Sequence, residues 1–225
     1  MNRRRFVTAL GGTAVAGAQQ KRLLLPSDKP DEFHLRLMWY NPVPPVDPRM
    51  WTLKVSGLVD KPQPFTLAQL RKLPQMQKSV RLKCVQCWSA RASWGGFRFE
   101  EILEAVKPKK NARAIRIDCA DKWYEYMSLD EMASPHALMT LDLAGKPLPD
   151  NHGAPLRIID GSKYGYKSAK LITNITFVAE GKGSMACDIG PYYSPGGDIL
   201  AGYDHPLDLG LNVRRKINGG AITDY

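Results

Sequence analysis

Apolar and polar positions alternate in short segments that are spread along most of the chain. Each segment is bounded by glycine, proline or polar residues, which is the pattern of short strands separated by turns. Strands are predicted at 51–57, 77–82, 114–119, 138–143, 155–159 and 172–178. Many short strands favour a strand-rich domain over a helical bundle.

Three short helices are predicted between these strands. In the segment 99–106 apolar residues recur at positions i, i+3, i+4 and i+7, which is the spacing of one helix face. Thr66 is the expected N-cap of a helix at 65–70, and Ser128 with Glu131 has the spacing of a capping box. Together the elements predict an α+β fold: a single mixed α/β domain, rich in strands and loops.

The flanks of this domain differ from it in composition. Residues 19–50 contain several prolines that exclude long helices, so we expect an extended lead-in there. The domain itself is expected over residues 51–225. The part after residue 178 has many glycines and prolines and little periodicity, which predicts irregular structure that wraps the domain.

The first 18 residues have the layout of an export signal. Arginines at positions 3–5 precede Phe6 and Val7, and a glycine-rich, weakly hydrophobic segment leads to Ala-Gly-Ala at 16–18. This order of charged, apolar and small residues is typical of a signal peptide. The arginines before Phe-Val resemble a twin-arginine signal, which carries folded proteins. We therefore expect residues 1–18 to be a twin-arginine signal peptide and the mature protein to be periplasmic; a basic N-terminal arm is the alternative.

The chain is strongly basic, with 32 lysines and arginines against 22 acidic residues and a formal net charge of +10. No known nucleic-acid-binding module accompanies this charge, so no nucleic-acid partner is expected. A basic surface also suits an anionic cofactor, an acidic protein partner or a membrane surface. No apolar run reaches the roughly 18 residues of a membrane-spanning helix.

Cys84 follows the strand predicted at 77–82 and precedes a turn-like segment. A thiolate is a soft metal ligand and a strong nucleophile. Gly95 and Gly96, a little further along, are expected to let a large ligand approach the backbone beside this cysteine.

Cys84 and Cys87 form a C-x-x-C pair, but the chain has no second pair to complete a zinc ribbon. Two other interpretations stay open at this point. The four cysteines of an exported protein can form structural disulfides in a non-catalytic periplasmic module. A thiol–disulfide enzyme using Cys84 and Cys87 is the second.

The segment 84–97 resembles the sulfite oxidase family of molybdopterin enzymes, since Cys-Val-Gln-Cys-Trp-Ser is followed by Trp-Gly-Gly-Phe. His-Gly-Ala-Pro-Leu-Arg at 152–157 is similar to a pterin-binding segment of that family. Lys-Tyr-Gly-Tyr-Lys-Ser-Ala-Lys at 163–170 resembles the periplasmic methionine sulfoxide reductase branch. Tyr40-Asn41 lies just before the first predicted strand, as in the family, and Asp204-His205-Pro206 resembles the same branch. The resemblance extends over about residues 35–210.

The resemblance implies that the chain binds molybdopterin with molybdenum, and that Cys84 is the catalytic metal ligand. It places pterin or phosphate contacts at Asn41, Cys119, His152, Arg157, Ser168, Ala169 and Lys170. The residue types suit these roles, because Arg157 can donate two parallel hydrogen bonds to a phosphate and Lys170 adds a point charge. Backbone N–H groups of Ser168 and Ala169 are expected to line the phosphate as an anion-binding nest. Related reductases often have threonine where this chain has Cys119.

The resemblance further implies a molybdopterin-dependent oxidoreductase that transfers an oxygen atom, with two electrons, to or from a small substrate. Sulfite oxidases surround their anionic substrate with arginines, whereas this chain has Tyr40 before Asn41 and Trp88-Ser89 after the cysteines. Sulfoxide-like reduction is therefore favoured over sulfite oxidation. A tyrosine from the segment 190–195 is a candidate proton donor at the metal. The expected electron-transfer partner is a membrane haem b subunit or a c-type cytochrome.

The interpretation of residues 1–18 makes a direct prediction. Replacing Arg3 and Arg4 together by lysine keeps the charge but removes the arginine pair, so the precursor is expected to stay in the cytoplasm. Cell fractionation followed by immunoblotting measures this. Normal delivery of the double variant to the periplasm would contradict a twin-arginine route.

Overall fold

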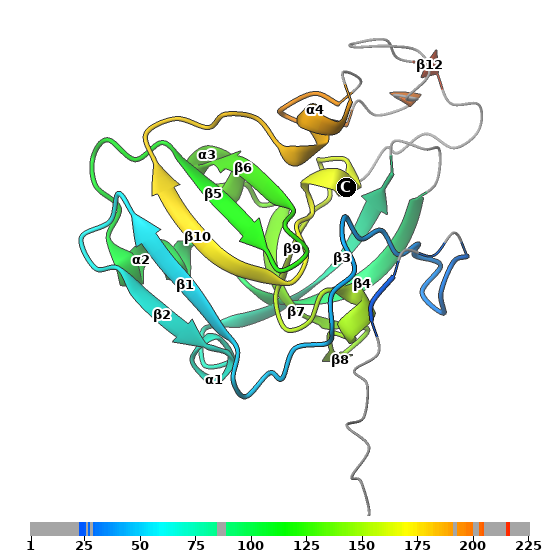
Figure 1. Cartoon of the computed structure of the whole chain (residues 1–225), viewed down its shortest axis with the longest axis horizontal. Helices are drawn as coiled ribbons and strands as arrows, with labels where there is room; N and C mark the ends of the chain where they lie inside the picture. The colour runs from blue at the N-terminus through cyan, green and yellow to red at the C-terminus, as the bar shows by residue number, and fades with distance from the viewer. Residues whose placement is uncertain are drawn as a thin grey trace, which may run out of the picture.

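The computed structural model describes residues 23–25, 27, 29–84, 89–190 and 193–199, and the backbone of 203–204 and 215–216. The described elements form two five-stranded sheets and a separate two-stranded ribbon. The two sheets pack against each other around a shared core, and the helices are short pieces at their edges (Figure 1). The predicted signal peptide, Cys87, His205 and Pro206 lie outside the described residues.

The first sheet has the strand order β2-β1-β10-β5-β6. β1 and β10 pair in parallel, and all other neighbours in this sheet pair antiparallel. The strands are β1 (Thr52–Gly57), β2 (Gln63–Thr66), β5 (Ala114–Cys119), β6 (Tyr124–Ser128) and β10 (Ile172–Val178).

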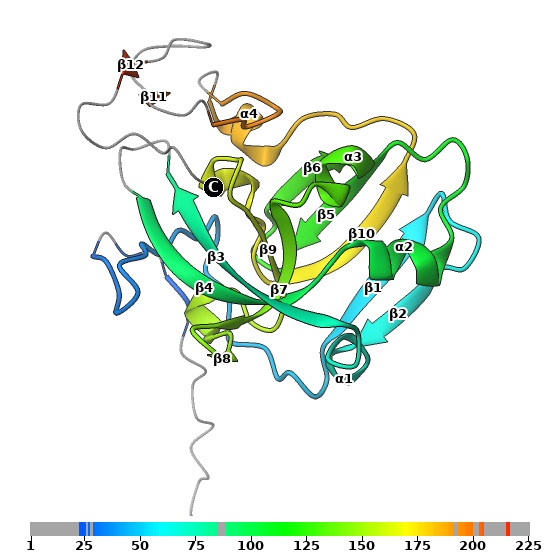
Figure 2. The ribbon, with the colours of Figure 1, turned by 180° about the vertical axis from the view of Figure 1, so that it is seen from behind.

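The second sheet has the order β3-β4-β7-β8, and β9 pairs with the other edge of β7. Its strands are β3 (Gln75–Lys83), β4 (Ser89–Phe97), β7 (Ala137–Leu143), β8 (Lys146–Pro147) and β9 (Arg157–Asp160). The long β3–β4 hairpin curves away from the first sheet, as both views show (Figures 1 and 2). The ribbon consists of β11 (Tyr203–Asp204) and β12 (Arg215–Lys216).

The helices are α1 (Leu67–Leu70), α2 (Glu100–Val106), α3 (Leu129–Ala133) and α4 (Met185–Ile189), with 3₁₀ turns η1 (Asp150–His152) and η2 (Gly165–Lys167). Both predicted N-caps are confirmed as capping boxes. The Thr66 hydroxyl accepts a hydrogen bond from the backbone of Gln69, and Ser128 does so from Glu131. None of the helices in the described ranges is long and apolar enough to cross a bilayer.

The strand-rich α+β fold is confirmed, and every predicted strand is present. The strands at 114–119 and 172–178 have the predicted ends, and the others have shifted ends. The sequence missed β6, because Glu125 occupies an inward-facing position and breaks the apolar alternation there. The turn-like segment expected after Cys84 is wrong for residues 89–97, which form strand β4.

The role expected for Gly95 and Gly96 is also wrong. These glycines sit at a β-bulge where β4 pairs with β7. A Cβ on Gly96 would lie 1.9 Å from the carbonyl oxygen of Met139, so the close approach is to a neighbouring strand and not to a ligand. Trp94 and Phe97 are three positions apart, so the alternation of the strand places them in different hydrophobic clusters.

The second sheet is buried on both faces. One face packs on the first sheet in the main core, which includes Phe97 and Met139. Trp94 and Leu138 point to the other face, where Leu35 of the N-terminal segment covers them. We call residues 29–50 the strap; this segment contains no helix or ladder strand and passes the β3–β4 hairpin before it enters β1 (Figure 1).

The close packing at the bulge predicts that stability is sensitive to substitution of Gly96. Gly96→Ala forces a methyl group into the backbone of β7, so we expect a loss of about 3 kcal/mol in the free energy of unfolding. Urea denaturation followed by tryptophan fluorescence measures this. Gly181→Ala is the matched control, because its added Cβ would have its nearest neighbour at an ordinary 3.4 Å. Equal stability of the two variants would contradict the assigned packing.

Candidate cofactor site

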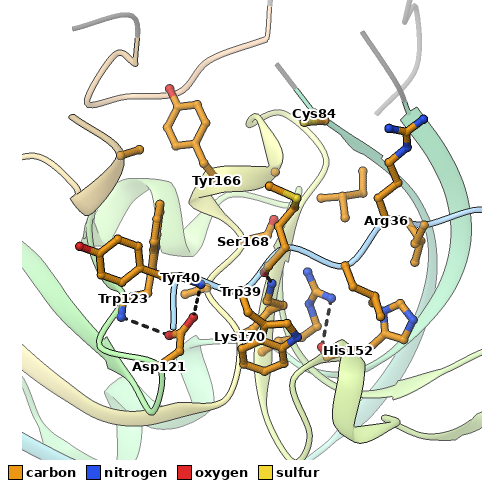
Figure 3. A pocket seen from close by; sticks show the side chains of 18 of the residues that line it. Arg36, Trp39, Tyr40, Cys84, Asp121, Trp123, His152, Tyr166, Ser168 and Lys170 are labelled. Atoms are coloured by element: carbon orange, nitrogen blue, oxygen red, sulfur yellow. Dashed lines mark hydrogen bonds between the residues drawn. The ribbon is translucent and has the colours of Figure 1, made fainter. Parts of the chain in front are cut away.

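A cavity of about 310 Å³ lies where the strap, the end of β3, the turn around η1 and the segment 165–170 meet (Figure 3). Its volume is within the range of cofactor pockets. Residues 35–40 of the strap form one wall, and α4 contributes Ala186 and Ile189.

Most of the residues predicted for the site line this cavity. They are Cys84, His152, Arg157, Ser168, Ala169 and Lys170. Asn41 and Cys119 do not line it. The Asn41 amide donates to the backbone oxygen of Asp121 at 2.8 Å, and the Asp121 side chain does line the cavity. Cys119 is buried at the end of β5, and burial raises the pKa of its thiol well above the usual value.

Gly153 brings the two halves of the candidate site together. It adopts φ +93°, and a Cβ placed on it would lie 2.6 Å from the Cβ of Lys170. The Leu171 N–H donates to the Gly153 oxygen at 3.1 Å, which holds the two segments in register. Only glycine allows this approach. Gly153 therefore lets His152 and Lys170 reach the same cavity.

Arg157 is a buried cation whose side chain has no carboxylate partner among the described residues. Its exposed fraction is 3%, it donates to the His152 backbone oxygen at 3.1 Å, and it lies 5.0 Å from the Trp94 ring centroid. Its Nε has no hydrogen-bond partner in the ranges that the structure describes. Burial lowers the pKa of Arg157 to about 9. A buried guanidinium with an open donor is complementary to an anion.

Lys170 lies beside Arg157, and its pKa is also lowered. Burial, followed by the charge of Arg157, lowers the pKa of Lys170 to about 7. Its ammonium group donates to the backbone oxygen of Met38 and lies 4.7 Å from the Trp39 ring centroid. A bound anion would stabilise the charged form of both side chains.

The Ser168 hydroxyl is buried and has no hydrogen-bond partner within the described part of the chain, and the same holds for the Asn151 side-chain oxygen. The backbone nest expected at Ser168 and Ala169 is wrong. Their N–H groups donate to the oxygens of Gly165 and Lys167 within η2. The Ser168 side chain is therefore the open donor that this segment offers to the cavity.

The other two lysines of the segment 163–170 do not face the cavity. Lys163 binds Glu131 at 2.5 Å and Asp198 at 2.7 Å, and Lys167 binds the buried Glu125 at 2.7 Å. Burial raises the pKa of Glu125 to about 7 despite this partner. These lysines are structural, because both are buried and paired with carboxylates.

Cys84 lies at the opposite end of the cavity from the cations, directly after β3 (Figure 3). It packs in a small cluster with Tyr164, Tyr166, Tyr193 and Ile199. Burial and the neighbouring Cys84 raise the pKa of Tyr193, so this phenol keeps its proton. The structure thus places a tyrosine of the segment 190–195 beside Cys84, as the sequence suggested. Cys84 and Cys119 form no disulfide.

The sequence reasoning missed the part that the strap plays in the cavity. Arg36, Met38 and Tyr40 line it, and Asp121 accepts a hydrogen bond from the Tyr40 N–H at 3.0 Å. A proline-rich segment gives no periodic signal, so only the aromatic residues next to Asn41 pointed to this wall.

His152 generates a prediction about pH. Burial and the charge of Arg157 lower its pKa from 6.5 to about 4, so the folded protein keeps this ring neutral. The unfolded chain takes up the proton first as the pH falls. The corresponding stability is complete above pH 6.5 and is lost, by about 3 kcal/mol, as the pH falls towards 4. Urea denaturation of cofactor-free protein at pH 7 and pH 4.5 measures it.

His152→Gln is expected to remove this part of the pH dependence. Other groups titrate in both proteins and cancel in the difference. His34→Asn, which changes an exposed histidine of the strap, is the control and should behave as wild type. An unchanged pH dependence in His152→Gln would refute the neutral, buried state of His152.

Comparison with known proteins agrees with this arrangement. The family model for the oxidoreductase molybdopterin binding domain matches residues 40–185. The protein-methionine-sulfoxide reductase catalytic subunit MsrP of Ralstonia nicotianae is 38% identical over 147 residues, covering 58% of this chain and 44% of that protein. The subunit of the same name from Burkholderia mallei is 35% identical over 147 residues, with the same coverage.

Among solved structures, the sulfane dehydrogenase SoxCD of Paracoccus pantotrophus matches with a TM-score of 0.57 at 15% identity. This match covers 62% of this chain and 40% of that one, and it supports the fold alone. The chain covers less than half of the length of each of these relatives. On the match over residues 40–185, the chain belongs to the oxidoreductase molybdopterin-binding domain family, which is the sulfite oxidase family.

Proposed function

We propose that this protein is an exported, molybdopterin-dependent oxidoreductase that transfers an oxygen atom between a small substrate and water, coupled to two electrons. One observation carries the proposal. Arg157 and the Ser168 hydroxyl are buried donors with open hydrogen-bonding capacity among the described residues, Lys170 is half-buried beside them, and Cys84 lies at the other end of the cavity. An elongated ligand with a phosphate at one end and a metal at the other matches this polarity.

The donor set fits the proposed cofactor. Arg157, Ser168 and Lys170 would hold its phosphate, and His152 would contact the phosphate or the pterin. Cys84 would ligate molybdenum through its thiolate, which is a soft ligand. Among the described residues no three His, Cys, Asp or Glu side chains gather as a metal site, so the remaining metal ligands would have to come from the cofactor. When bound, the cofactor supplies the two-electron and oxygen-atom chemistry.

The side chains of this protein would bind, shield and protonate. The cations at the inner end anchor the ligand, and the strap excludes water from that side. Tyr193 keeps its proton beside Cys84 and can donate it to a developing oxyanion there. Asn41 and Cys119 support the cavity from behind, since neither reaches its surface.

We propose a sulfoxide as the substrate class, which agrees with the names of the MsrP relatives. The mouth carries apolar side chains, because Met38, Tyr40 and Ile189 are each about half exposed there. The strap also contributes Arg36 to the wall, a cation that the sequence comparison with sulfite oxidases did not count. A single exposed arginine does not match the several arginines expected around a sulfite substrate.

The relatives are named catalytic subunits, so we propose that a partner protein supplies the electrons. A membrane haem b subunit or a c-type cytochrome fits a periplasmic reductase. The basic surface of the chain, with its formal charge of +10, would speed association with an acidic partner.

The central prediction concerns Cys84→Ser. Loss of the protein thiolate removes one metal–sulfur bond but leaves the phosphate anchor, so we expect activity to be abolished while the pterin stays bound. Elemental analysis and pterin fluorescence of protein purified from the periplasm measure the occupancy. X-ray absorption at the molybdenum edge should show one Mo–S bond fewer than in wild type.

Two further variants make this test specific. Arg157→Gln removes the buried anchor and should lower pterin content as well as metal content. Cys187→Ser changes a half-buried thiol that does not line the cavity, and should leave occupancy unchanged. Wild-type protein without molybdenum or pterin would refute the proposed function. Full activity of Cys84→Ser would refute the ligand assignment.

A further inference from the structure

Asp31 joins the strap to the candidate cofactor site across 121 residues of sequence. Its Oδ1 accepts hydrogen bonds from the N–H groups of Phe33 at 2.8 Å and Leu35 at 3.0 Å, which fixes a tight turn in the strap. Its Oδ2 faces Nε2 of His152. A single carboxylate therefore organises the strap and contacts a side chain that lines the cavity.

This contact is well shielded from water. The His152 side chain is 3% exposed and that of Asp31 is 15% exposed. The ring of Phe33 meets the His152 ring edge-on, with 5.7 Å between centroids. Two residues of the strap therefore hold the imidazole from one side, and its orientation is fixed.

The contact also decides which nitrogen of the ring carries the proton. An ionised carboxylate can only accept, so Nε2 must be the donor. Burial and Arg157 keep the ring neutral, since the pKa of His152 is about 4. Nδ1 is then a hydrogen-bond acceptor. The cavity thus receives an acceptor near Arg157 and Lys170, which can only donate.

We propose that Asp31 is a positioning residue for the cofactor: it holds His152 as the Nε2–H tautomer and latches the strap onto the cavity wall. The inference rests on the proposed function, because the cofactor is the ligand for which His152 is positioned. Outer partners of this kind orient the groups that contact the ligand. Two contacts support the same docking, from Lys170 to the Met38 oxygen and from the Tyr40 N–H to Asp121.

The first test compares Asp31→Asn with Glu32→Gln in the full-length chain. An asparagine can present an N–H to Nε2 and so favours the opposite tautomer, with Nδ1 protonated. We expect the rate of pterin and molybdenum loss during dialysis to rise about tenfold in Asp31→Asn. Glu32→Gln removes the same charge from an exposed position next in the strap, and should lose cofactor at the wild-type rate. Equal rates for all three proteins would overturn the proposal.

The second test observes the histidine directly. Nitrogen-15 NMR of histidine-labelled protein distinguishes the two neutral tautomers, and the His152 signals are assigned by their absence in His152→Gln. Wild type is expected to show the Nε2–H form, and Asp31→Asn the Nδ1–H form. A wild-type ring in the Nδ1–H form would overturn the proposal, whether or not any variant folds well.

Limited proteolysis separates this inference from the proposed function. Cleavage within residues 29–40 should be about tenfold faster in Asp31→Asn than in wild type, because a buried hydrogen bond to a charged group is lost. If wild type holds no pterin, the proposed function fails, and the tautomer and cleavage rates still decide whether the latch exists. If wild type holds pterin but Asp31→Asn keeps it equally well, the latch fails alone.

Discussion

A guanidinium without a carboxylate, buried beside a cavity, is the constraint on which the site depends. Moving a cation out of water is costly unless an opposite charge or several hydrogen bonds replace the solvent. Arg157 has one backbone acceptor and an aromatic face, and its Nε is unpaired. Lys170 and His152 show the same imbalance, since the pKa of each is lowered by burial and by Arg157. An anion at this end of the cavity would therefore favour the charged forms of Arg157 and Lys170.

The segment 163–170 also contains lysines whose charges are balanced by carboxylates. Lys163 and Lys167 each have carboxylate partners at 2.7 Å or less, and they tie β6, α3 and the segment 195–198 together. Three lysines with nearly equal spacing thus divide into two structural residues and one that faces the cavity. The partners available to each ammonium group, and not its position in a motif, decide its role.

The fold could be predicted from the sequence where side-chain periodicity follows burial. The strands β5 and β10 and the N-caps Thr66 and Ser128 depend on local pattern alone, and they were predicted correctly. Strand β6 was not predicted, because one of its inward-facing residues is Glu125, which is paired with Lys167 more than forty residues away. The Gly95-Gly96 bulge was misread because the backbone that it accommodates, β7, is distant in sequence.

The candidate site was predictable by residue type and not by geometry. The resemblance to a family named residues, but it did not separate those that line the cavity from Asn41 and Cys119, which lie behind it. The resemblance also did not identify Asp31, because this carboxylate contacts His152 only in the folded chain.

The parallel pairing of β1 with β10 has a consequence for biosynthesis. It joins Lys54 to Asn174 and Gly57 to Phe177, so the first sheet closes only after most of the chain has been made. Contacts of such high sequence separation form slowly, because the entropy of a long loop is lost before the contacts stabilise it. The segment 165–170 leads directly into β10, so its side chains reach their final positions only when that strand docks. A ligand that needs these side chains would therefore bind only after the polypeptide has completed this topology.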